Sequence, residues 1–98
     1  MADYAYRVER ALVGMIDARA TRDGYQKGQF ARLVWPWIDG DGAPSRWSAI
    51  RNQVGKTGKP QNLTVSDLVR MCAVIHEDPS FLLSLARGQI AGEEKSTD

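Results

Sequence analysis

Apolar residues recur at intervals of three and four along most of this 98-residue chain, and no segment shows the strict alternation expected of a half-buried strand. The clearest run is Val8, Leu12, Met15 and Ile16. These side chains would share one face of a helix that begins after Asp3, a suitable N-cap, and ends between Thr21 and Gly24. The spacing therefore favours an all-α fold.

A second helix is expected over residues 29–34 and a third over residues 45–54. Their inward residues would be Phe30, Leu33 and Val34 in the second, and Trp47, Ile50 and Val54 in the third. Pro36 disfavours helical geometry at Trp35, so the second helix should end there. Glycines, aspartates and a proline fill residues 39–44 and predict a turn, with Ser45 as the N-cap of the third helix.

Two more helices complete the expected fold. Thr64 and Asp67 are typical of a capping box at the start of the fourth helix. Asp78 and Pro79 are typical of the N-cap and first residue of the fifth helix. The inward residues would be Val65, Leu68, Val69, Cys72 and Ile75 in the fourth helix, and Phe81, Leu82 and Leu85 in the fifth. Gly88 should end the last helix. The sequence predicts one compact bundle of about five short helices over residues 1–88, and a polar, disordered tail over residues 89–98.

The net charge of +1 conceals a basic middle segment. Residues 26–60 hold six basic and two acidic residues, and no acidic residue lies between Asp41 and Asp67. Such a segment suits a polyanionic partner. The single cysteine, Cys72, excludes an internal disulfide. No apolar run approaches the roughly 18 residues of a membrane span, and no leader-like segment is present, so a cytoplasmic protein without membrane association is expected.

The third helix carries the most informative surface. With Trp47 and Ile50 inward, the opposite face presents small and polar side chains that can hydrogen-bond to base edges. The residues on or beside that face are Ser45, Arg46, Ser48, Ala49, Asn52, Gln53 and Lys56. A solvent-exposed helix face without a partner is the simplest alternative for this stretch taken alone.

The whole pattern resembles the helix-turn-helix domain of the phage repressor and Cro family, the lambda repressor-like fold. Phe30-Ala31 stands where the family has its Leu-Ala, and Ser45 at the N-cap of the recognition helix. Gly58-Lys59-Pro60 resembles the family's following loop, and residues 68–82 resemble its closing two helices. The resemblance covers residues 5–86. The interval between the two motif helices, residues 35–44, is longer than the family's turn of about four residues.

This resemblance implies a transcriptional regulator, a phage-type repressor that binds double-stranded DNA in a sequence-specific way. Base-reading residues would be Arg46, Ser48, Ala49, Asn52 and Gln53. Phosphate-binding residues would be Lys27, Ser45, Arg51, Lys56 and Lys59. The family binds DNA as a two-fold dimer. Here the contact between copies would come from the last helix or from the insertion Trp35–Ile38.

Other functions are also compatible with the sequence. A protein-interaction module of the antitoxin type could use the Trp35–Ile38 insertion or the last helix, and a bundle that has lost DNA binding would have the same core. An enzyme is not expected, because the single histidine, His76, has no nucleophile pattern around it. Cys72 and His76 lack the second pair that four-coordinate zinc needs, so no metal or other cofactor is expected.

Overall fold

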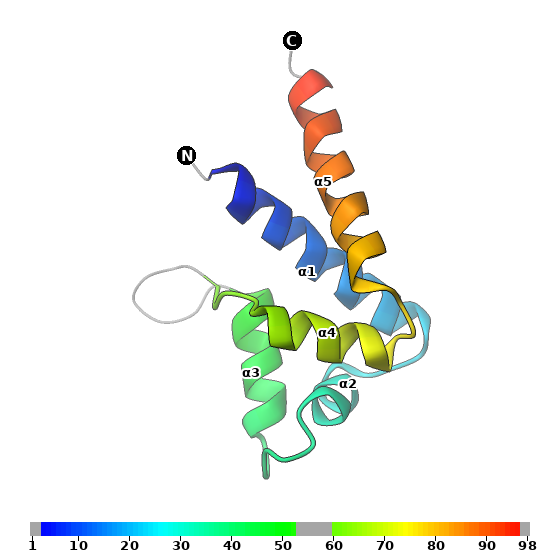
Figure 1. The fold of residues 1–98 in the computed structure, drawn as a ribbon. Helices are drawn as coiled ribbons and strands as arrows, with labels where there is room; N and C mark the ends of the chain where they lie inside the picture. Colours follow the sequence, from blue (N-terminus) through cyan, green and yellow to red (C-terminus); the bar gives the residue numbers. More distant parts are fainter. Residues whose placement is uncertain (1–2, 53–59, 97–98) are drawn as a thin grey trace.

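Residues 3–52 and 60–96 are described by the computed structural model, and these residues form five α-helices and no strand (Figure 1). The helices are α1 (Tyr4–Arg22), α2 (Lys27–Val34), α3 (Gly42–Arg51), α4 (Val65–Val74) and α5 (Pro79–Ser96). The predicted all-α bundle is therefore confirmed. None of the described helices is long and apolar enough to cross a membrane.

Local capping explains where α1 and α4 begin and how α1 ends. The Asp3 carboxylate accepts the backbone N–H of Tyr6 at 2.7 Å, and the Thr64 hydroxyl accepts that of Asp67 at 3.1 Å. After α1, Gly24 adopts a φ of 91°, a left-handed conformation that favours glycine. The predicted caps at Asp3 and Thr64 are confirmed.

The third helix begins earlier than the sequence suggests. α3 starts at Gly42 with Asp41 as N-cap, so the prediction of Ser45 as the N-cap is wrong. Pro44 falls within the first turn, where its missing N–H costs nothing because that group has no partner inside the helix. The connection between α2 and α3 is consequently residues 35–41. α3 ends at Arg51 and Asn52 is its extended C-cap, so the prediction that the helix includes Asn52 is wrong; its predicted continuation to Val54 falls on residues 53–59, which lie outside the described part.

The last helix continues beyond its predicted end. α5 runs through Gly88 to Ser96, so the prediction that Gly88 ends it is wrong, as is a disordered tail beginning at residue 89. Leu82, Ala86 and Ile90 are buried at intervals of four, and α1 is the main partner of α5. Burial of Ile90 outweighs the cost of a helical glycine, about 1 kcal/mol.

One core joins all five helices. Its fully buried members include Ile16, Phe30, Trp47, Met71 and Leu82, each from a different helix. The rings of Phe30 and Trp47 lie 5.4 Å apart at 59°, which joins α2 to α3. The predicted core positions Trp47 and Ile50 are confirmed. Figure 1 shows α2 and α3 at one end of the molecule and the chain termini at the other.

Several predicted inward residues are exposed instead. They are Leu33, Val65, Val69, Phe81 and Leu85. In α4 the buried residues are Asp67, Met71 and Cys72, and Ile75 at its C-cap is buried too. The predicted inward positions of Cys72 and Ile75 are therefore confirmed, whereas Val65 and Val69 face outward, on a helix whose buried side includes the hydrogen-bonded Asp67 carboxylate.

Candidate nucleic-acid interface

The outward face of α3 is polar and uncharged. Ala43, Trp47 and Ile50 attach the helix to the core, and the opposite side presents Ser45 and Asn52, both exposed. Ser48 and Ala49 lie between them and are half-buried. The side-chain amide of Asn52, the C-cap residue of α3, donates to the Ser48 hydroxyl at 3.3 Å. These four residues form the α3 face.

Asp67 of α4 forms the centre of a hydrogen-bonded cluster beside this face. Its carboxylate is fully buried and accepts the Trp35 indole N–H at 3.0 Å, the Arg46 guanidinium at 3.0 Å and the Arg70 guanidinium at 3.3 Å. The three donors come from the turn after α2, from α3 and from α4. A buried carboxylate needs such partners, because an unpaired buried charge is strongly unfavourable.

The ionisation of Asp67 follows from these contacts. Burial raises the pKa of the carboxyl, but hydrogen bonds with Trp35, Thr64 and Arg46, and the charge of Arg46, outweigh burial. The pKa therefore lies below the ordinary value of 3.8. At neutral pH the cluster contains one carboxylate and two guanidinium groups, and so carries a net positive charge.

Arg46 belongs to this cluster and not to the centre of the α3 face. Its guanidinium lies 5.2 Å from the centroid of the Trp35 ring, and its side chain is 35% exposed. It therefore borders the α3 face on the side of α4, with Arg70 next to it. Sequence reasoning missed Arg70. Its spacing of three residues from Asp67 is the signal that could have indicated it.

Basic residues also border the opposite edge of the α3 face. The Arg51 guanidinium lies 5.3 Å from the centroid of the Trp47 ring, and no carboxylate of the described residues pairs with it. Beside it, a hollow of about 340 Å³ is lined by residues of α1 and the end of α3, among them Gly14, Asp17 and Asn52. Lys27 of α2 donates to Asp17 across 2.9 and 3.2 Å.

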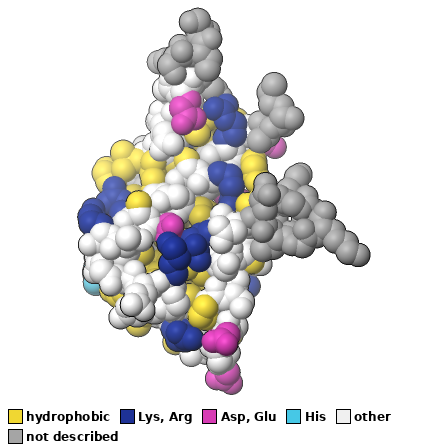
Figure 2. Space-filling model, turned by 180° about the vertical axis from the view of Figure 1, so that it is seen from behind, with side chains coloured by type: hydrophobic (Ala, Val, Ile, Leu, Met, Phe, Trp, Pro, Cys, Tyr) yellow, Lys and Arg dark blue, Asp and Glu magenta, His cyan; other side chains and the backbone are white. Residues whose placement is uncertain are grey.

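Arg10 holds the C-terminal end of α3 in place from α1. Its guanidinium donates to the Ile50 carbonyl at 2.6 Å and to the Gln61 carbonyl at 3.4 Å. The last carbonyls of a helix lack partners within the helix, and a cation there is favourable. Figure 2 shows the molecule from behind, with dark blue Lys and Arg side chains spread from the top to the bottom of that face and magenta acidic groups among them.

The start of α3 is acidic. Asp41 is the N-cap residue, but its side chain makes no capping hydrogen bond; it is 95% exposed and lies 3.4 Å from the Arg32 guanidinium. Asp39 lies on the same turn and is exposed. The positive charge around the α3 face therefore lies beside its middle and its C-terminal half.

The predicted site residues are thus distributed in three ways. Ser45, Ser48, Ala49 and Asn52 share the α3 face; Arg46, Arg51 and Lys27 lie around it; and Gln53, Lys56 and Lys59 lie outside the described residues. Across residues 3–52 and 60–96, no group of three or more His, Cys, Asp or Glu side chains is placed to hold a metal ion.

Comparison with known proteins identifies no relative of this chain. No protein-family model matches the chain, and no curated protein or solved structure matches it significantly.

Proposed function

We propose that the protein is a sequence-specific transcriptional regulator, of the phage repressor type, that docks the α3 face in the major groove of double-stranded DNA. One observation carries the proposal: an uncharged, hydrogen-bonding helix face has guanidinium groups along both edges. The major groove is about 12 Å wide, admits one helix and has phosphates on both sides. Neutral side chains in the middle and cations at the edges match that arrangement.

Within this proposal the side chains divide into two tasks. Ser48 and Asn52 would hydrogen-bond to base edges, and Ala49 would contact a thymine methyl. Arg46, which is held by Asp67, would contact the sugar-phosphate backbone at the α4 edge, while Arg51 and Lys27 would contact it at the opposite edge. Asp41 would repel phosphates, which directs the DNA toward the C-terminal half of α3.

Two copies would bind a two-fold operator, with half-sites about 34 Å apart. A single recognition helix covers only a few base pairs, so a dimer would supply the length of a specific site. The last helix and the Trp35–Ile38 insertion are the two surfaces proposed for the contact between copies.

A charge placed on the α3 face tests the proposal directly. Ser45→Glu adds a carboxylate to the exposed face, and Ser84→Glu makes the same change on the exposed side of α5. Fluorescence anisotropy with a labelled random-sequence duplex at low salt measures the affinity. We expect Ser45→Glu to weaken binding about tenfold or more, because like charges at an interface cost more than about 1.4 kcal/mol.

The control variant Ser84→Glu should bind duplex like the wild type, with circular dichroism confirming that both variants remain folded. A salt titration should give a steep negative slope of log affinity against log salt, since phosphate neutralisation releases counterions. Equal affinity of the two variants, or no binding of duplex by the wild type at low salt, would rule out docking through α3.

A further inference from the structure

We propose that a groove between α1, α4 and α5 binds a small amphiphilic anion, a molecule with an apolar body and one carboxylate. The groove encloses about 350 Å³, which falls within the roughly 300–1,000 Å³ of small-molecule sites. All three helices line it: Val8 and Leu12 belong to α1, Val65 and Leu68 to α4, and Leu83 and Arg87 to α5. None of the lining residues is among those proposed to contact DNA, so the site is separate from the α3 face.

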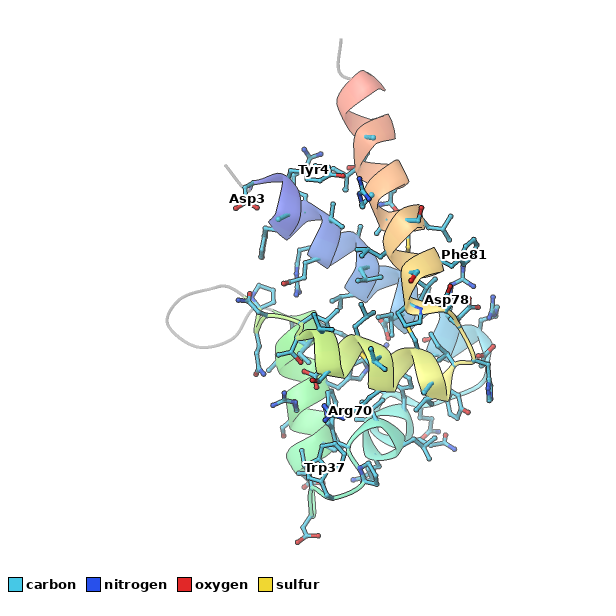
Figure 3. All side chains as sticks on the ribbon, in the orientation of Figure 1. Asp3, Tyr4, Trp37, Arg70, Asp78 and Phe81 are labelled. Atoms are coloured by element: carbon cyan, nitrogen blue, oxygen red, sulfur yellow. The ribbon has the colours of Figure 1, made fainter. Side chains whose placement is uncertain are left out.

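Apolar side chains of the groove remain in contact with water. Val65 is 79% exposed and Leu83 is 39% exposed. The Tyr4 ring adds an aromatic surface at the N-terminal end of α1, and Figure 3 shows this residue at the opposite end of the molecule from Trp37 and Arg70. A ligand with an apolar body would remove these side chains from water, and this burial is the main favourable contribution to its binding.

The charges of the groove favour an anion over a cation. Arg87 is the one basic residue among those that line the groove; it is exposed, and it forms no ion pair with a carboxylate of the described residues. Glu9 is the one acidic lining residue, and its carboxylate already pairs with Arg10 at 2.8 Å. A guanidinium matches the geometry of a carboxylate and can bind it through two parallel hydrogen bonds. An apolar molecule with an anionic end therefore fits both the walls and the charge.

A fluorescent aromatic anion tests the site in the full chain without DNA. Anilinonaphthalene sulfonate emits strongly when it binds apolar surface, and we expect the folded wild type to bind it with one-to-one stoichiometry. Decanoate, kept below its micelle concentration, should displace the dye. Decyltrimethylammonium has the same chain with a cationic end, and it should displace the dye about tenfold less effectively, because Arg87 repels it.

Two pairs of variants locate the site. Arg87→Gln should weaken dye binding about three- to fivefold, since an ion pair that stays in contact with water is modest, and Arg22→Gln makes the same change at the far end of α1. Ala5→Phe places a ring in the groove and should weaken binding about tenfold or more, because it takes the space that the ligand needs. Ala18→Phe, at an exposed position of α1 outside the groove, should bind like the wild type.

Circular dichroism confirms that each variant is folded, and the outcomes do not depend on DNA binding. Absence of dye binding by the wild type would overturn the proposal, as would equal affinities of Ala5→Phe and Ala18→Phe. Equal displacement by decanoate and decyltrimethylammonium, or equal affinities of Arg87→Gln and Arg22→Gln, would contradict the preference for an anion. If wild-type copies associate in sedimentation and Ala5→Phe separates them, a second copy occupies the groove and the proposal is wrong. Arg87 is exposed, so its substitution remains decisive if Ala5→Phe impairs folding.

Discussion

The indole nitrogen of Trp35 donates a 3.0 Å hydrogen bond to the carboxylate of Asp67, and both side chains are buried. This bond joins the turn after α2 to the first turn of α4, and Arg46 of α3 reaches the same carboxylate. The position of α3 relative to α4 therefore depends on one acidic side chain.

Removal of this carboxylate should destabilise the fold. In Asp67→Ala the buried Trp35 N–H would lose its acceptor, and the guanidinium groups of Arg46 and Arg70 would lose their counter-charge. Together these losses should lower the unfolding free energy by about 3 kcal/mol. Urea denaturation followed by circular dichroism measures the loss. Asp39→Ala removes an exposed carboxylate and should change stability by less than about 0.5 kcal/mol. Similar losses in the two variants would contradict the central role of Asp67.

Acid should weaken the same cluster. Because the pKa of Asp67 is lowered when the protein folds, its ionisation stabilises the native state above the unfolded value of 3.8, and that contribution is lost as the pH falls through the lower folded value. Asp67→Asn cannot ionise, so below pH 3.8 its unfolding free energy should fall less steeply than that of the wild type. If the unfolding free energies of the two proteins change with pH in parallel, the Asp67 carboxyl does not contribute to the pH dependence of stability.

A carboxylate near the α3 face should restrain DNA binding. Asp17 pairs with Lys27 at 2.9 Å, and this exposed pair contributes little to stability. Asp17→Asn frees the ammonium group, and we expect it to raise affinity for duplex about three- to tenfold at low salt and less at high salt. Asp23→Asn makes the same change at the end of α1, away from α3. If both variants gain affinity equally, net charge alone is responsible and Lys27 has no special role.

Two glycines, one inside α1 and one in the turn after it, should respond to alanine in opposite ways. A Cβ at Gly14 would meet no atom within 4 Å, and the residue lies inside the helix. Gly14→Ala should therefore raise the unfolding free energy by about 0.5–1 kcal/mol. Gly24 has a φ of 91°, so Gly24→Ala should lower the unfolding free energy by about 1 kcal/mol. Thermal melting of both variants checks the signs, and a destabilised Gly14→Ala would disagree with the open space beside α1.

The sequence was sufficient for features that depend on neighbouring residues. Hydrophobic spacing located the five helices, the caps Asp3 and Thr64 follow from local chemistry, and the inward positions of Trp47 and Ile50 identified the α3 face. In contrast, α5 extends past Gly88 because Ile90 packs in the core, and this tertiary contact outweighs a local signal for termination.

The Asp67 cluster could not be predicted for a similar reason. Asp67 is separated by 32 residues from Trp35 and by 21 from Arg46, and in the sequence it looks like an ordinary helix-capping residue. Only the packing of α4 on α2 brings these side chains together. The same packing leaves Val69 exposed and places Arg70 beside Trp37, which lies in the Trp35–Ile38 insertion that the sequence already suggested as a contact surface.

The three tryptophans give the protein a built-in optical probe. Trp35 and Trp47 are almost completely buried, whereas Trp37 is 60% exposed. An aqueous quencher such as acrylamide should thus reach one indole out of three in the native state. Light emitted by that indole comes from the turn between α2 and α3, so anything that covers this turn will alter quenching without an attached dye.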